Sequence, residues 1–275
     1  MSRLTIGAVL LGLISAAALL SLVWTPATAP LALDIANRLS APGPGHVFGT
    51  DQLGRDTASL VMLGAANALV IAVPAMLIAM LIGSAAGIWS GVRGGSGAAL
   101  AMRALEILFA FPPVLSAMLL ALTLGPGRTS AILAIGLFAA PVFARVSAAE
   151  ARRIMASEHV LAARALGAGP GRILRAHVLP ALGGLIAVQA SIQFGLAILT
   201  EAGLGYLGLG TPPPSPSWGR MLADSQTYLQ SAPWLALAPG MAIAVCVLGA
   251  GLLGDGLAAR LDPRRARTRT RTRRG

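Results

Sequence analysis

The sequence predicts an all-α membrane protein that crosses the bilayer about six times and keeps both termini in the cytoplasm. Of its 275 residues, 56% are hydrophobic and only 11% are charged, whereas an ordinary soluble domain carries about 25% charged residues. Mean hydropathy is +0.76. Six apolar runs are each close to the length of about 20 residues that a membrane-spanning helix needs, and arginines gather in one set of the loops between them.

The six predicted spans cover residues 4–24, 64–88, 102–124, 130–149, 181–200 and 234–258. The first run has a second interpretation, a cleaved signal peptide, because Ala27-Thr28-Ala29 resembles a cleavage site. Its apolar stretch exceeds the core of about 7–15 residues that signal peptides use, so we favour a retained anchor. The predicted regions are then an anchor helix with an extracytoplasmic segment over 1–63, a membrane core over 64–263 and a cytoplasmic arginine-rich tail over 264–275.

The distribution of arginine sets the predicted orientation, because Lys and Arg accumulate in cytoplasmic loops. With the N-terminus inside, only Arg38, Arg55, Arg128 and Arg220 fall outside, and the other seventeen arginines fall inside. The opposite orientation reverses this bias and is rejected. Both termini and the loop at about 150–180 are therefore expected in the cytoplasm.

Two features of the predicted spans concern helix packing. Small residues recur every four positions at Ala79, Gly83, Gly87 and Gly91, and small residues on one face let helix backbones approach closely in lipid. Packing is the favoured interpretation of this stripe, and a ligand path is the alternative. Pro112-Pro113 predicts a break in the third span, whose freed carbonyl groups need neighbouring helices or water as partners.

Polar and aromatic residues also mark the loops expected outside. Asp51, Arg55 and Asp56 fit either a solvated turn with local ion pairs or part of an outer face that meets a partner protein. Three aromatic residues suit the interfacial belt that tryptophan and tyrosine form at membrane surfaces. They are Trp218, Tyr228 and Trp234.

The stretch Glu158–Pro180, EHVLAARALGAGPGRILRAHVLP, is a polar, arginine-bearing island between two apolar spans. Residues 162–166 favour a helix, and the glycines and the proline within 167–171 break it. A second helix is expected over 173–179 and should stop at Pro180. From spacing alone, two interpretations stay open: a docking element for a cytoplasmic partner, or an ordinary basic loop that only fixes topology.

The same stretch resembles the EAA loop of bacterial ABC-importer permeases, because Ala162-Ala163, Gly167 and Leu179-Pro180 stand at the family's spacing. It departs from the pattern at Leu161, where the family has Glu, and at His177, where the family has Ile. Three further motifs resemble the dipeptide and oligopeptide branch, so that the resemblance covers about residues 46–263. These motifs are HVFGTDQLGRD at 46–56, MRALE…AFP at 102–112 and EAGLGYLGLGTPPPSPSWGRML at 201–222.

This resemblance implies the type I fold of ABC-importer permeases and a multi-pass subunit of the bacterial inner membrane. Such a subunit moves dipeptides, oligopeptides or related small solutes into the cytoplasm. The implied partners are a second homologous permease, two ABC ATPase subunits and an extracytoplasmic solute-binding protein. In the family the loop is the coupling helix, which sits in a groove of the ATPase. The coupling residues implied for this chain are Glu158, Ala162, Ala163, Arg164, Gly167, Ile173, Leu179 and Pro180.

Missing residue types restrict the chemistry of the chain. All 21 of its Lys and Arg residues are arginine, so the lysine of a phosphate-binding Walker A loop is absent. We therefore expect a transport subunit rather than an enzyme, with no cofactor of its own and with ATP bound by partner subunits. No H-E-x-x-H zinc motif and no G-x-S-x-G nucleophile elbow occurs in the sequence.

The high positive charge, +11, has its own explanation. Base-reading modules are absent, so nucleic acid is not an expected partner. Membrane lipid is an expected partner, because each arginine of the tail gains about 1 kcal/mol near an anionic surface. The alternative class of transporter is an ion- or proton-coupled secondary carrier. Such carriers place ionisable residues in the middle of their spans, and the predicted spans here are nearly bare of them.

Overall fold

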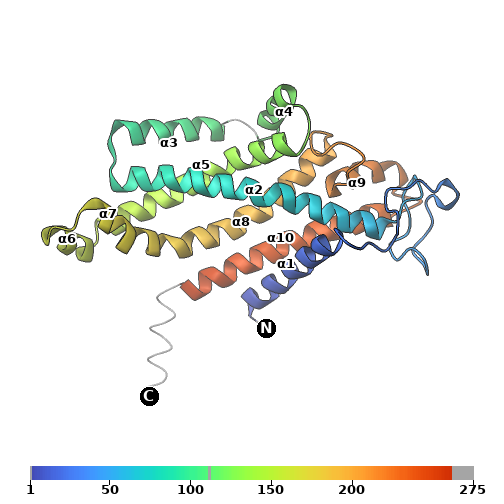
Figure 1. The fold of residues 1–275 in the computed structure, drawn as a ribbon, viewed down its shortest axis with the longest axis horizontal. Coiled ribbons are helices and arrows are strands. Elements are labelled where there is room, and N and C mark those ends of the chain that lie inside the picture. Colours follow the sequence, from blue (N-terminus) through green and yellow to red (C-terminus); the bar gives the residue numbers. More distant parts are fainter. Residues whose placement is uncertain (1, 111–112, 262–275) are drawn as a thin grey trace, which may run out of the picture.

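The computed structural model describes residues 2–110 and 113–261, which form helices and connecting loops without a β-sheet (Figure 1). The predicted tail over 264–275 and Phe111-Pro112 lie outside the described residues. The helices are α1 (Arg3–Leu20), α2 (Thr57–Val92), α3 (Gly95–Ala110), α4 (Pro113–Leu124), α5 (Arg128–Met155), α6 (Glu158–Ala165), α7 (Pro170–Ile173), α8 (Leu179–Tyr206), α9 (Trp218–Ser225) and α10 (Trp234–Leu261). A π-helical segment, Leu174–Val178, joins α7 to α8, and short 3-10 turns lie at Ile35–Asn37 and Gln226–Tyr228.

Five helical stretches of the described chain are long and apolar enough to cross a membrane: α1, α2, α5, Pro170–Tyr206 and α10. They coincide with five of the six predicted spans and extend most of them. The third predicted span, 102–124, is wrong as a single helix, because α3 and α4 divide it at the predicted proline break. The predicted boundary between residues 63 and 64 falls inside α2.

The small residues of α2 pack directly against α5. A Cβ atom added to Gly83 would lie 2.8 Å from the Cβ of Phe143, and one added to Gly87 would lie 2.9 Å from the Cβ of Ser147. Further along, a Cβ at Gly91 would lie 2.9 Å from the carbonyl oxygen of Ala148. These distances leave no room for a side chain, so the packing interpretation of the stripe is confirmed.

Residue numbers increase in the same direction on both sides of this contact, from Gly83 beside Phe143 to Gly87 beside Ser147. Helices α2 and α5 therefore run parallel to each other. A chain that crosses the membrane twice in the same direction must return between the two crossings, and only α3 and α4 lie between them. Phe109 of α3 stacks on Phe138 of α5 with ring centroids 5.4 Å apart, and the guanidinium of Arg145 lies 4.4 Å from the Phe109 centroid. This cation–π contact gives a charge within α5 a partner.

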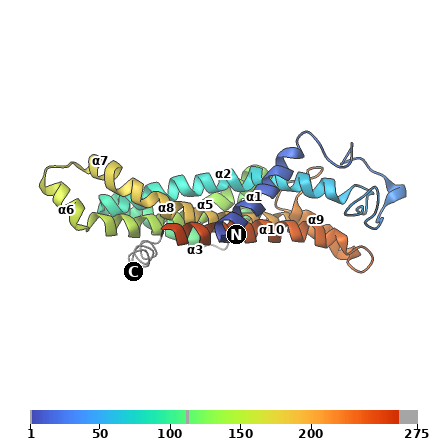
Figure 2. The ribbon, with the colours of Figure 1, turned by 90° about the horizontal axis from the view of Figure 1, so that it is seen from below.

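The remaining long helices alternate in direction. Arg3 of α1 pairs with Asp255 of α10 at 3.3 Å, which brings the start of α1 beside the end of α10. A Cβ at Gly195 of α8 would lie 3.3 Å from the Cβ of Ala250, and one at Gly184 would lie 2.8 Å from a methyl group of Leu261. The start of α8 therefore lies at the same end as the start of α1 and the end of α10, which agrees with the predicted topology (Figures 1 and 2).

At the outer end of the molecule, the segment around Asp51 and Asp56 is compact and internally hydrogen-bonded, and it is called the outer knot below. It is not a solvated turn, so that part of the prediction is wrong. Asp51 and Asp56 are buried. Asp51 accepts from the Arg55 guanidinium at 2.7 Å and from two backbone N–H groups at 2.8 Å. Asp56 caps α2 by accepting from the Ser59 N–H at 2.8 Å and also contacts His46 at 3.0 Å. A cap of this kind stabilises a helix by about 1 kcal/mol.

Trp218 belongs to the core, not to the interfacial belt predicted for it. Its side chain is fully buried, its indole N–H donates to the carbonyl of Val61 at 2.9 Å, and its ring fills the space beside Gly64. Trp234 donates to the carbonyl of Thr50 at 3.2 Å. Trp218 thus fastens α9 to the start of α2, and Trp234 fastens α10 to the outer segment that precedes α2.

The glycine contacts predict opposite effects for one substitution at two sites. Gly87→Ala forces a methyl group into the backbone of α5, an overpacking that costs about 1–3 kcal/mol. Gly251→Ala places the same methyl group on α10, where no atom lies within 4 Å, and should be neutral or stabilising by about 0.5–1 kcal/mol. The measurement is the thermal unfolding midpoint of each purified variant. Equal midpoints would contradict the α2–α5 contact.

Candidate functional site

The cytoplasmic loop over 150–180 is placed at the far end of the molecule from the outer knot (Figures 1 and 2). Helix α5 continues beyond its apolar part to Met155, and α6 follows after two residues. Arg153 donates through Nε to a carboxylate oxygen of Glu150 at 2.8 Å, one turn earlier on α5. The loop thus begins as a direct extension of a membrane helix.

A glycine turn separates α6 from the next helix, as the sequence predicts. Gly167 has φ +84°, a conformation that only glycine adopts without cost. The Gly167 N–H donates to the carbonyl of Arg164 at 2.9 Å, and the Ala168 N–H donates to that of Ala163 at 3.0 Å. This pair of bonds is the Schellman arrangement, which satisfies the last carbonyls of a helix and fixes the direction of the departing chain.

The second helix does not stop at Pro180, so this part of the prediction is wrong. It begins at Pro170 and runs through the π-helical segment 174–178 into α8. The N–H of Leu179 donates to the carbonyl of Leu174, five residues earlier. A π turn widens the helix, and we attribute to it the room for the ring of Pro180, which in a regular α-helix clashes with the carbonyl four residues before.

An apolar cluster holds the loop to the membrane helices. It joins α5, α6, α7 and the start of α8 through buried side chains, and Val160 and Ile173 are 0% and 1% exposed. Its members are Ala151, Ile154, Met155, Val160, Ile173, Val178 and Leu182. Ile173 therefore anchors the loop from inside and offers no surface to a partner.

The other predicted coupling residues lie on two different surfaces. Glu158, Ala162, Arg164 and Gly167 are exposed on α6 and its turn, and Ala163 is half-buried. Leu179 and Pro180 are also exposed, but at the beginning of α8, and Leu179 lines a groove against α2. The structure groups the α6 residues and separates them from the Leu179-Pro180 pair.

Two exposed leucines are not among the predicted contacts: Leu161 on α6, and Leu166, which caps the end of α6. Leu161 is 51% exposed and Leu166 is 89% exposed, although both are large apolar side chains beyond the membrane spans. The signal in the sequence was an apolar residue on each side of Ala162-Ala163-Arg164 within a polar stretch. Exposed apolar side chains of this kind mark a surface that a partner covers.

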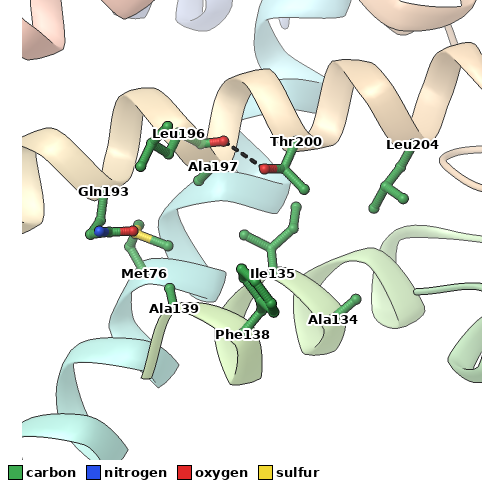
Figure 3. A pocket seen from close by; sticks show the side chains of 10 residues that line it. All are labelled: Met76, Ala134, Ile135, Phe138, Ala139, Gln193, Leu196, Ala197, Thr200 and Leu204. Atoms are coloured by element: carbon green, nitrogen blue, oxygen red, sulfur yellow. Dashed lines mark hydrogen bonds between the residues drawn. The ribbon is translucent and has the colours of Figure 1, made fainter. Parts of the chain in front are cut away.

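A cavity of about 140 Å³ lies among α2, α5 and α8 in the middle of the molecule (Figure 3). Its walls are apolar except for Gln193 and Thr200. The Thr200 hydroxyl donates a hydrogen bond to the carbonyl of Leu196 at 2.7 Å, within its own helix. The lining residues are Met76, Ala134, Ile135, Phe138, Ala139, Gln193, Leu196, Ala197, Thr200 and Leu204.

A polar cluster, buried except for Arg128, lies beside the outer end of this cavity. Asn67 of α2 accepts hydrogen bonds from Arg128 at 2.9 Å and from Thr211 at 3.0 Å, and donates to Glu201 at 3.3 Å. Glu201 is fully buried on α8, three residues before Leu204 of the cavity wall, and its Oε2 atom has no partner among the described residues. Burial of such groups in lipid is expensive unless they are paired.

The sequence does not predict this polar cluster. Glu201 follows the fifth predicted span and begins the motif at 201–222, Arg128 counts only among the outer arginines, and Asn67 lies within the apolar run of the second predicted span. The available signal was a polar residue within a predicted span, which in a membrane protein demands a partner.

Comparison with protein families identifies the chain. Residues 83–267 match the family of binding-protein-dependent transport system inner membrane components. This match covers α3 to α10 with the loop between them, and every residue of the cavity lining except Met76. The chain belongs to this family.

Its relatives include bacterial peptide permeases. It is 40% identical over 228 residues to the dipeptide transport system permease protein DppC of Alkalihalophilus pseudofirmus, which covers 83% of this chain and 75% of that protein. It is 36% identical over 241 residues to the probable D,D-dipeptide transport system permease protein DdpC of Escherichia coli, with 88% and 81% covered. The glutathione transport system permease protein GsiD of Pectobacterium atrosepticum is 36% identical over 223 residues, with 81% and 74% covered.

A solved structure with the same fold is the MetNI methionine ABC transporter in its inward-facing conformation. The TM-score is 0.60 at 18% identity, over 74% of this chain and 96% of the matched chain. The resemblance to ABC-importer permeases of the peptide branch is confirmed, as are the type I permease fold and the inner-membrane location. Such permeases are transport components that work with ATPase and other subunits. These findings give no support to a secondary carrier.

The polar cluster yields a stability prediction. Asn67→Ala leaves the buried Glu201 carboxyl and Thr211 hydroxyl without their hydrogen-bond partner, which costs about 1–3 kcal/mol for each group; Arg128 is exposed and can turn to water. The control is Thr123→Ala, because that exposed hydroxyl bonds only carbonyls of its own helix. The thermal midpoint of the purified protein should fall for the first variant and stay unchanged for the second. Equal midpoints would show that the cluster does not hold the helices together.

Proposed function

We propose that the chain is the permease subunit of an ATP-driven importer that moves dipeptides, oligopeptides or related small solutes into the cytoplasm. The family match supports the transporter class, and the relatives named for dipeptides, peptides and glutathione support this cargo class. The observation that carries the proposal is α6, a short helix with exposed leucines, rigidly anchored at the cytoplasmic end of the membrane bundle.

The proposed assembly contains a second homologous permease, two ABC ATPase subunits and an extracytoplasmic solute-binding protein. ATP binds to the ATPase subunits, and this chain hydrolyses none, which agrees with the absence of a lysine for a phosphate-binding loop. The outer knot around Asp51 and Asp56 is part of the surface that meets the binding protein, because its hydrogen bonds hold it in one shape above the start of α2.

The coupling step follows from the way in which α6 is held. Val160 of α6, Ile173 of α7 and Ile154 of α5 share one buried apolar cluster, so a displacement of α6 is passed on to α5. When the ATPase subunits close on ATP, a groove on each carries its bound coupling helix with it. Helix α5 then transmits the displacement along its contact with α2, and the membrane helices change between inward and outward access.

The proposed passage for cargo runs along the faces of α5 and α8 that line the cavity. The cavity walls are apolar apart from a few polar groups such as the Gln193 amide, so they would hold a peptide weakly. Weak contacts of this kind suit a passage, since tight binding there would delay release. The sister permease would complete the passage from the opposite side.

The turn at Gly167 provides the test of coupling. Gly167→Val places a β-branched residue at φ +84°, a strain of about 1–3 kcal/mol that redirects the chain after α6. Gly169→Val is the matched control, because Gly169 has φ −70° and no atom lies within 4 Å of an added Cβ at either position. In vesicles that contain the complete transporter, ATP-dependent peptide uptake should fall at least tenfold for Gly167→Val and remain near normal for Gly169→Val.

Two measurements make this result specific. The amount of permease in the membrane should be equal for both variants, since the strain lies outside the spans, and less ATPase should co-purify with Gly167→Val. Normal uptake and normal co-purification by that variant would reduce the loop to a topological connector. Uptake driven by a proton gradient without ATP would overturn the proposed class of transporter.

A further inference from the structure

A groove on the cytoplasmic half of the molecule lies apart from the coupling helix and from the cargo cavity. It has a volume of about 390 Å³ and runs between the end of α2 and the segment that leads into α8. Ile88, Trp89 and Val92 form one wall, and Leu174 and Leu179 form the other. Trp89 and Leu179 are each 45% exposed. The groove is thus an open, mainly apolar slot whose volume can hold part of a hydrocarbon chain.

The end of the groove toward the cytoplasm is cationic. Arg93, the residue that caps α2, lines the groove itself. A second hollow shares Gly171 and Leu174 with the groove and is lined by Arg172 and Arg175. Among the described residues that line the two hollows, none is acidic. The site therefore combines an apolar slot with three arginines at one end, which matches an amphiphile that has an anionic head.

The level of the groove in the bundle fits the inner surface of the bilayer. Helix α2 has 36 residues and is about 54 Å long at 1.5 Å per residue, so it extends beyond a hydrocarbon core of about 30 Å. Its outer end reaches the knot at Asp56, and its inner end carries Trp89 and Arg93, residue types that gather at the membrane interface. In Figure 1 the end of α2 lies beside α7, on the membrane side of α6.

The wall of the groove also contains the least regular part of the helical backbone. Leu174 begins the π-helical segment 174–178, which carries Arg175 as well. A π turn inserts an extra residue and changes the direction in which the following side chains point. Here it brings a leucine to the slot and an arginine to the adjoining hollow within two consecutive residues.

We propose that this groove binds one anionic phospholipid of the cytoplasmic leaflet, with an acyl chain between Trp89 and Leu174 and the phosphate at Arg93. Charge complementarity selects this occupant: the chain's own arginine-rich end has the same sign as the groove, and a neutral lipid leaves the arginines without a counter-charge. The lipid packs against both α2 and the start of α8, so it stabilises the joint between the membrane bundle and the loop segment. This inference does not depend on the cargo or on the coupling role of α6.

Fluorescence quenching of Trp89 tests the proposal. The full-length protein, with the subunits that co-purify with it, is reconstituted in phosphatidylcholine vesicles that contain equal small fractions of either dibrominated phosphatidylglycerol or dibrominated phosphatidylcholine. The Trp89 signal is the difference between the natural protein and Trp89→Phe, which removes one of its four tryptophans. Brominated chains quench an indole on contact, so quenching by phosphatidylglycerol should exceed quenching by phosphatidylcholine severalfold.

The variant Arg93→Gln separates a built site from diffuse attraction. It should lower the preference for phosphatidylglycerol about fivefold, the factor that corresponds to about 1 kcal/mol for one arginine near an anionic surface. Arg152→Gln is the matched control, because this exposed arginine lies at the same end on α5 and lines neither hollow.

The alternative results each overturn the proposal in a different way. Equal quenching by the two lipids would mean that the groove takes any acyl chain. Equal losses for Arg93→Gln and Arg152→Gln would mean that the preference belongs to the whole charged surface. No quenching by either lipid would mean that a protein subunit covers the groove.

Discussion

The parallel packing of α2 on α5 is the contact on which the other helices depend. Glycines 83, 87 and 91 let the two backbones touch along about two turns, and the space at each is filled by α5 atoms rather than by a side chain of α2. Two parallel neighbours cannot be joined by a short turn. The chain must therefore return across the membrane between them, and it does so through the two short helices α3 and α4, with the aromatic and cation–π contacts of Phe109 as their attachment to α5.

The same contact determines where force from the cytoplasm enters the bundle. Helix α5 extends without interruption from Arg128 in the outer polar cluster to Met155 beneath the coupling loop. Its cytoplasmic end shares an apolar cluster with α6 and α7, and its outer end is tied through Asn67 to α2 and through Glu201 to α8. A single helix, α5, thus connects the loop, the cavity wall and the outer polar cluster.

Much of this arrangement was predictable because it rests on local properties of the chain. Apolar length, the arginine bias, the stripe of small residues and the positive φ of Gly167 follow from residue types and their spacing. The predictions that were wrong depended on distant contacts. Nothing near Trp218 in the sequence shows that Val61 accepts its N–H, and nothing near Asp51 shows that the backbone N–H of Leu39 donates to its carbonyl.

The loop shows the same division within one short segment. Its helix, its glycine turn and its exposed arginine follow from sequence, whereas the burial of Ile173 and the π-helical passage beneath Pro180 arise from packing against α5 and the start of α8. The exposed leucines at α6 combine a feature that the sequence shows with one that only packing shows. Their chemistry is visible in the sequence, but only the fold shows that they are left uncovered at the end of the molecule.

The central claim is that α6 lies in a groove of an ATPase subunit, and site-specific photo-cross-linking tests it directly. A photoreactive amino acid replaces Leu166, which is 89% exposed on the loop, or Leu122, which is 82% exposed on α4. In membranes that contain the complete transporter, the probe at position 166 should cross-link this chain to the ATPase subunit, and the probe at position 122 should not. Failure of the Leu166 probe to reach the ATPase, or equal cross-linking from both positions, would contradict the account.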